Sequence, residues 1–168
     1  MDSSSPAMIS FLDISKAFDT VCLDRLINKL YKIGIRGTTL ILLKNYLFNR
    51  KQYVRVNSVK SECINVSIGI PQGTILGPLL FNLYINDILD INNTICYADD
   101  IVVMCYGETW QEAKINMENM LNEIYCWTFQ NKLLINIAKT KFMTFGNKID
   151  SIPIHISITV SMDSPLRG

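Results

Sequence analysis

The chain has 168 residues, of which 49% are hydrophobic, and its formal net charge is only +1. A chain of this length and apolar content can bury a substantial core, so a disordered chain is excluded and a single domain is expected. No apolar stretch approaches the roughly 20 residues that a membrane-spanning helix needs. No basic start leads into an apolar run, as it would in a secretory signal. We therefore expect a soluble intracellular protein of the nucleus or cytoplasm, with no membrane partner.

Five cysteines are spread along the chain and none forms a C-x-x-C pair: Cys22, Cys63, Cys96, Cys105 and Cys126. An odd number without paired spacing argues against both a disulfide framework and a zinc site. We predict that they are reduced core residues. The net charge is low for a nucleic-acid binder, whose phosphate contacts require a basic surface.

The first half of the chain predicts a strand, two helices and a hairpin. Residues 8–14 form a short apolar run, typical of a buried strand, and Asp13 lies at its end. Apolar positions at helical spacing over residues 23–33 precede Gly34, which is a helix stop signal. A second helix is expected at about 38–48. Residues 52–56 and 64–68 alternate around the polar link 57–62, which predicts two strands or a hairpin.

The second half begins where the segment Gly-Ile-Pro-Gln-Gly at residues 69–73 breaks the pattern. A helical stripe runs from Leu76 to Ile88, followed by β-prone runs at 94–97 and 101–105 that place Asp99 and Asp100 at a hairpin turn. Residues 110–128 predict a long amphipathic helix. Residues 133–137 and 141–145 predict a closing pair of strands. This order indicates an α+β fold, with an antiparallel sheet covered by helices on one face.

Carboxylates stand at the ends of two apolar β runs, Asp13 at one and Asp99-Asp100 at the other. Like charges about 4 Å apart repel by about 4 kcal/mol at the effective dielectric of a protein surface, so such a cluster requires cations or basic groups to offset it. Two magnesium ions about 4 Å apart can hold the attacking and leaving oxygens of a phosphoryl displacement. Taken separately, the acidic pair could be a solvated turn and Asp13 a helix cap.

Four segments together resemble the palm motifs of reverse transcriptases: FLDISKAFD at residues 11–19, GIPQGTILGPLLF at 69–81, YADD at 97–100 and LINIAKTK at 134–141. The A-F-D ending of the first and the L-x-N-x-x-K-T pattern of the last resemble retrotransposons without long terminal repeats, of the jockey type. The resemblance covers residues 8–146. It implies a polymerase palm with a ferredoxin- or RRM-like antiparallel core.

The resemblance also implies an activity and its partners. The chain is expected to be an RNA-directed DNA polymerase core that adds a deoxynucleoside triphosphate (dNTP) to a DNA primer on an RNA template, with two Mg²⁺ ions as cofactors and Mn²⁺ as a substitute. Residues 1–7 and 147–168 are expected to be flanking segments. Basic fingers residues before the first motif and a thumb with its L-G-x motif after the last are not visible in the sequence.

The family's functional residues carry over onto matching positions of this chain. The resemblance makes Asp13, Asp99 and Asp100 metal ligands, with the backbone carbonyl of Ile14 as a further ligand. Lys139 matches the lysine that protonates pyrophosphate, although Lys141 is an equally suitable donor. The remaining matches concern the dNTP and the primer: amides of Ser15, Lys16 and Ala17 at the triphosphate, Phe18 as a gate against a 2′-hydroxyl, Gln72 and Gly73 at the nascent base pair, and Tyr97 beside the primer terminus.

Two other functions fit parts of the pattern. An RNA-dependent RNA polymerase shares the palm, but it typically has Gly-Asp-Asp where this chain has Ala98-Asp99-Asp100, and a polar residue in place of Phe18. A truncated or co-opted palm could instead serve as a non-catalytic module that binds nucleic acid or protein.

Overall fold

The computed structural model describes residues 5–146, and these fall into two compact units that are described separately. The first contains residues 5–15, 87–130 and 134–146, and we call it the sheet unit. The second contains residues 16–86 and 131–133, and we call it the helical unit. The expected flanking segment 147–168 lies outside the described residues, as do residues 1–4.

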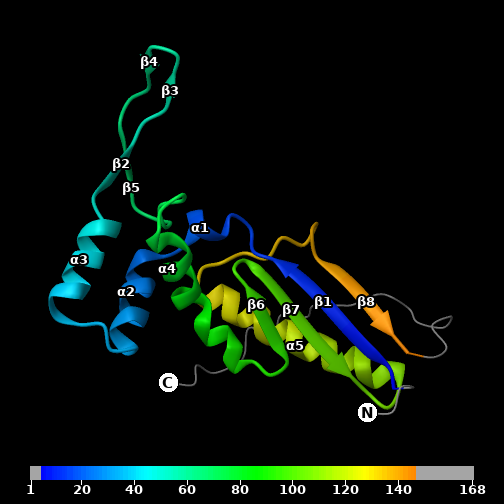
Figure 1. The fold of residues 1–168 in the computed structure, drawn as a ribbon. Helices are drawn as coiled ribbons and strands as arrows, with labels where there is room; N and C mark the ends of the chain where they lie inside the picture. The colour runs from blue at the N-terminus through cyan, green and yellow to red at the C-terminus, as the bar shows by residue number, and fades with distance from the viewer. Residues whose placement is uncertain (1–4, 147–168) are drawn as a thin grey trace. The chain divides into compact units, whose positions relative to one another are not determined.

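The sheet unit is built on a four-stranded antiparallel sheet (Figure 1). Its strands are β1 (Ala7–Asp13), β6 (Thr94–Tyr97), β7 (Asp100–Tyr106) and β8 (Lys141–Phe145), in the order β6-β7-β1-β8. The central pair, β1 and β7, joins segments that lie more than 80 residues apart in the sequence. The sheet therefore brings the first and third sequence motifs side by side.

One face of the sheet is covered by the long helix α5 (Trp110–Gln130), as Figure 1 shows. Strand side chains point alternately to the two faces, and in β1 the buried positions are Met8, Ser10 and Leu12. The helix presents a buried stripe to the same core: Ala113, Met117, Leu121 and Ile124. The alternate positions of β1, which include Phe11 and Asp13, belong to the face that α5 leaves open.

The helical unit contains α1 (Ala17–Thr20), α2 (Leu23–Lys32), α3 (Gly37–Leu47) and α4 (Leu76–Ile85), and the 3₁₀ helix η1 (Asn86–Asp90) follows α4. Helix α2 packs against both α3 and α4. The Lys29 ammonium donates a hydrogen bond to the backbone carbonyl of Tyr84 at 2.6 Å, and the buried Tyr84 hydroxyl donates to the carbonyl of Asn131. A hairpin rises between α3 and α4 from four short strands: β2 (Arg50–Gln52), β3 (Arg55–Val56), β4 (Val59–Lys60) and β5 (Ile64–Val66).

The mixed helix-and-sheet class and the antiparallel sheet predicted from the sequence are confirmed. The predicted strand at 133–137 is wrong, because this segment forms only an isolated bridge between Ile14 and Ile135. Lys132 adopts a left-handed φ of 54°, and the amides of Lys139 and Thr140 turn back to the Asn136 carbonyl, so the chain cannot stay extended there. The polar link 57–62 is shorter than predicted, since it contains β4.

The cysteines also differ from the prediction. Cys105 is buried, but Cys63 is exposed on the hairpin, and the other three are half-buried. The hairpin has no core into which a thiol could be placed. Within residues 5–146, no helix is long and apolar enough to span a bilayer.

Candidate active site

Strand pairing places the acidic residues together at one end of the sheet. Asp13 ends β1 and lies directly opposite Asp100, the first residue of β7. The Ile14 amide donates to the carbonyl of Asp99 at 3.3 Å. Directly opposite residues of an antiparallel pair project from the same face. Asp13 and Asp100 therefore share the open face, because their neighbours Leu12 and Ile101 are both buried on the covered face.

Asp99 lies in the tight turn between β6 and β7. Ala98 has a left-handed φ of 52°, which reverses the chain there, as hairpin turns require. Tyr97 pairs with Asp100 and leaves 84% of its side chain exposed on the open face. The turn predicted from the sequence is confirmed, and it places Tyr97, Asp99 and Asp100 at one end of the sheet.

Lys139 lies against the first acid. Its ammonium is 3.3 Å from Oδ1 and 3.2 Å from Oδ2 of Asp13. The segment that carries Lys139 is held in place by the Asn136 amide, which donates to the Asp13 carbonyl at 2.8 Å. The lysine side chain is 66% exposed, so the ion pair contributes little to stability.

The fit to a divalent cation is partial. Facing carboxylates are the oxygen ligands that Mg²⁺ prefers, and the backbone places Asp99 beside them. In the part of the chain that the structure describes, however, no three side chains of the Asp, Glu, His and Cys types are grouped to hold a metal. The donor set is therefore chemically suitable, whereas the side chains do not form a three-ligand site.

A hollow of about 700 Å³ opens over this end of the sheet. It is within the range of roughly 300–1,000 Å³ typical of ligand pockets. Acidic, basic and aromatic side chains meet on its wall: Asp13, Asp100, Lys139, Lys141 and Tyr97. A second hollow of similar size lies at the opposite end of the sheet, but there the Glu112 carboxylate accepts a hydrogen bond from the Glu108 amide, which is a structural role.

The predicted residues in the helical unit form a second cluster. The loop 69–73 is tied to the segment 18–21 by the Gly69 amide, which donates to the Val21 carbonyl at 2.8 Å, and by the Ile70 amide, which donates to the Phe18 carbonyl at 2.7 Å. Gln72 adds a side-chain bond at 2.7 Å from its Nε2 to Oδ1 of Asp19. The second motif is therefore held against the end of the first by three hydrogen bonds.

Within the protein, close backbone approach occurs at Gly69 and not at Gly73. A Cβ on Gly69 would lie 2.7 Å from the carbonyl oxygen of Asp19, whereas one on Gly73 would meet nothing within 4 Å. Both glycines have positive φ, 79° and 70°. Sequence reasoning missed Gly69 and Asn136 as positioning residues, although both stand inside the motifs as quoted.

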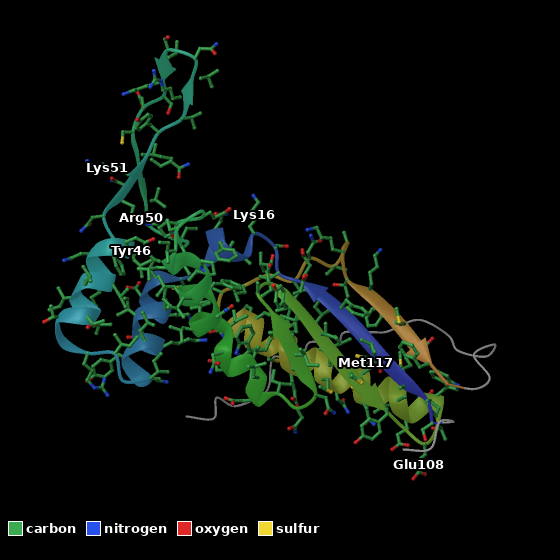
Figure 2. All side chains as sticks on the ribbon, in the orientation of Figure 1. Lys16, Tyr46, Arg50, Lys51, Glu108 and Met117 are labelled. Atoms are coloured by element: carbon green, nitrogen blue, oxygen red, sulfur yellow. The ribbon has the colours of Figure 1, made fainter. Side chains whose placement is uncertain are left out.

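Phe18 is half-buried, and its ring stacks on the fully buried Phe81 of α4, with centroids 4.6 Å apart and planes at 28°. One ring face therefore has a packing role. Lys16 has a left-handed backbone with φ of 49°, and Figure 2 shows its side chain extending into solvent. It leads into α1, which begins at Ala17. The Ser15 amide already donates to the Leu134 carbonyl at 2.7 Å, so it is not free to meet a triphosphate.

Among the described residues, no cysteine lines the hollow over Asp13 and Asp100. Burial raises the pKa of the Cys96 and Cys105 thiols to about 11. Both therefore stay protonated at neutral pH and are poor nucleophiles.

An antiparallel sheet with acids facing each other at one end, covered by helix on the other face, fits the palm-like fold of nucleic-acid polymerases. A family profile described as "Reverse transcriptase (RNA-dependent DNA polymerase)" matches residues 1–161, and the chain belongs to this family.

Curated relatives come from insect mobile elements. The chain is 28% identical over 163 residues to the "RNA-directed DNA polymerase from mobile element jockey" of Drosophila melanogaster, covering 91% of this chain and 18% of that protein. It is 31% identical over 140 residues to the "Probable RNA-directed DNA polymerase from transposon BS" of the same species, covering 77% and 15%. The match to transposon X-element is also 31%, covering 88% and 17%. The expected likeness to jockey-type elements is confirmed, and the chain spans less than a fifth of each of these relatives.

Proposed function

We propose that this chain is the catalytic palm of an RNA-directed DNA polymerase, which adds a dNTP to the 3′-hydroxyl of a DNA primer paired with an RNA template. The observation that carries the proposal is the pairing of Asp13 with Asp100 on the open face, in a chain of the reverse transcriptase family. The strand order β6-β7-β1-β8 supports a ferredoxin-like palm, because the two pairs of strands that helices link in sequence, β1/β6 and β7/β8, alternate across the sheet.

We propose Asp13, Asp99 and Asp100, together with the Ile14 carbonyl, as the holders of magnesium. When bound, two such ions stabilise the attacking and leaving oxygens of an in-line phosphoryl displacement. The open face supplies the other groups. The Lys139 ammonium, 3.2 Å from Asp13, is proposed to give a proton to departing pyrophosphate, and Lys141, which lines the same hollow, is the alternative donor. The exposed ring of Tyr97 is proposed to lie beside the primer end.

The helical unit is proposed to select the dNTP. The Phe18 ring stacks with one face on Phe81. We propose that this stacking holds the ring as a steric barrier to a 2′-hydroxyl. The amides and side chain around Lys16 and Ala17 are proposed to meet the triphosphate, since backbone amides near a left-handed turn suit anions. Gln72 and Gly73 are proposed to contact the nascent base pair.

Single-turnover addition of one dNTP to a primed RNA template tests this function. Enzyme in excess at low salt keeps the primer bound even where the grip on the duplex is weak. We expect Mg²⁺-dependent addition that Asp99→Asn reduces by at least about 100-fold, since charge stabilisation of this kind supplies several kcal/mol. Asp24→Asn, an exposed acid on α2, is the matched control and should leave the rate unchanged. Addition that is independent of Mg²⁺, or equal in the Asp99 variant, would refute the proposal.

A non-catalytic palm is the second candidate, and one observation favours it. Lys139 offsets the charge of Asp13, and in the described residues no three ligand-type side chains are grouped to hold a metal. Absence of addition, combined with undiminished nucleic-acid binding, would select this candidate. Membership of the reverse transcriptase family speaks against an RNA-dependent RNA polymerase.

A further inference from the structure

The hairpin of residues 50–66, which we call the arm, stands out from the helical unit as an extended two-stranded element (Figure 1). Every residue from 51 to 65 is exposed, including large apolar side chains on both faces. Isolated two-stranded hairpins are marginally stable in water, and they need packing on one face to persist. An arm that is exposed on both faces is therefore an element that gains stability from a bound partner.

The charge of the arm differs from that of the rest of the chain. It contains four basic residues, Arg50, Lys51, Arg55 and Lys60, and one acid, Glu62. The remaining residues together contain 12 basic and 14 acidic side chains. The near-neutral charge of the whole chain thus conceals a basic arm on a slightly acidic body. Such a distribution attracts a polyanion to the arm in particular.

The basic residues of the arm divide into Arg50, which has a structural role, and three exposed cations, of which Arg55 donates one hydrogen bond from Nε to the Asn57 carbonyl at 3.2 Å. The Arg50 guanidinium donates to the carbonyls of Leu47, Ile68 and Gly69, so it fastens the base of the arm. Lys51, Arg55 and Lys60 are exposed, and none of them forms an ion pair within residues 5–146. Figure 2 shows side chains projecting from both sides of the arm.

An exposed aromatic ring lies among these cations. Tyr53 is 50% exposed, and the Lys60 ammonium lies 5.0 Å from its ring centroid. Proteins that bind single strands combine cations, which neutralise phosphates, with aromatic rings on which bases stack. The exposed valines would suit a protein partner too, but three unpaired cations against a single acid favour a polyanion.

We propose that the arm binds nucleic acid, with Lys51, Arg55 and Lys60 on backbone phosphates and Tyr53 against a base. The inference rests on the proposed function only in that both assume a nucleic-acid ligand. It assigns this contact to an element that carries none of the proposed catalytic residues.

Fluorescence anisotropy with labelled single-stranded RNA and with an RNA–DNA hybrid tests the arm on the whole chain. The variant Lys51→Gln/Arg55→Gln/Lys60→Gln removes three exposed cations. Its matched control is Arg25→Gln/Lys32→Gln/Lys44→Gln, which removes three exposed cations from α2 and α3. Between about 50 and 200 mM salt, the plot of log K against log salt has a negative slope. For the single strand, the magnitude of this slope should be smaller by about 2 in the arm variant, since each phosphate contact contributes about 0.7. The control should change this slope by less than about 0.7.

Tyr53→Ser gives an independent reading. Loss of the ring removes base stacking, so this variant should bind single-stranded RNA about fivefold or more weakly. This loss of affinity should not depend on the salt concentration. Equal losses in the arm variant and the control, or unchanged binding in both, would overturn the proposal. Lack of binding by the unmodified chain would overturn it as well.

Cys63 provides a footprint on the arm itself. Its thiol is exposed, whereas Cys96 and Cys105 have pKa values raised to about 11 by burial and serve as unreactive internal references. Saturating RNA should slow alkylation of Cys63 several-fold, as measured by peptide mass spectrometry, and the triple arm variant should lose this protection. Alkylation of Cys63 that RNA does not slow, or that is already slow in the free chain because a second copy covers the arm, would overturn the proposal.

The two proposals fail in different assays. If the chain binds RNA through the arm but adds no nucleotide, the arm proposal stands and the polymerase proposal is refuted. If the chain adds nucleotides with Mg²⁺ but the arm variant binds RNA as its control does, the polymerase proposal stands and the arm proposal is refuted.

Discussion

Replacing Gly69 by alanine tests how the second motif is seated against the first. The new Cβ would lie 2.7 Å from the carbonyl oxygen of Asp19 and 3.0 Å from its carbonyl carbon and Cα. These are backbone atoms, which no rotamer change can move. The φ of 79° adds a conformational cost, because alanine is strained in that region.

Gly73→Ala separates these two effects. Its φ of 70° carries a similar conformational cost of about 1–2 kcal/mol, but its Cβ would meet nothing within 4 Å. The overlap at Gly69 adds a further roughly 1–3 kcal/mol, the usual cost of overpacking. The amide bonds from Gly69 to Val21 and from Ile70 to Phe18 would have to stretch to relieve it. We therefore expect the free energy of unfolding of Gly69→Ala to be about 1–3 kcal/mol lower than that of Gly73→Ala.

Urea unfolding followed by far-UV circular dichroism measures this difference, since helices α2, α3 and α4 all lie in the unit that contains both glycines. The free energies of unfolding of the two variants are compared with that of the unmodified chain. Equal losses within about 0.5 kcal/mol, the usual spread for small independent effects, would refute the steric argument and leave only a backbone effect common to both sites.

Three further outcomes are expected. Phe18→Val should raise incorporation of ribonucleotides relative to deoxynucleotides in the single-turnover assay, and unchanged discrimination would return Phe18 to a purely packing role. Lys139→Met should slow nucleotide addition by about 100-fold, while Lys141→Met should not; the opposite result would assign the role of proton donor to Lys141. The pKa of the Cys96 and Cys105 thiols rises from 9.0 to about 11 on folding, so the unfolded chain loses these protons first and stability should fall as pH rises from about 9 to 11. The loss is at most about 3 kcal/mol for each thiol and smaller for the half-buried Cys96; urea unfolding at about pH 8 and 10.5, with the double alanine variant as control, measures it.

Much of the fold was readable because its signals are local. A short apolar run marked β1, a β-prone run marked β7, the 3.6-residue stripe marked α5, and the two β-prone runs on either side of Asp99-Asp100 marked the turn. The failure at residues 133–137 has a different origin. A run of Leu and Ile favours a strand, but a strand needs a partner along its length, and here only Ile135 finds one.

The candidate site was predictable in identity and less so in geometry. Motifs named Asp13 and Asp100, but the register that sets them opposite each other depends on pairing between distant segments, which no local pattern encodes. The ion pair of Lys139 with Asp13 and the contact of Gly69 with Asp19 are likewise products of tertiary packing. The arm was predicted as a hairpin, but the exposure of residues 51–65, which makes its basic charge available to a ligand, could not be predicted from the sequence.

Leu12 pairs with Ile101 beneath α5, and this register fixes the face on which Asp13 and Asp100 lie. The position of these acids is therefore sensitive to insertions and deletions in the strands. Inserting or deleting a single residue in β1 would turn every following side chain to the other face, so Asp13 would point into the apolar layer and Leu12 into water. Many substitutions in these strands should therefore be tolerated at positions where an insertion or deletion would abolish the site. In the arm, where no face is buried, gain or loss of a residue at the Asn57–Ser58 tip should cost little, and variation in chain length should accumulate there.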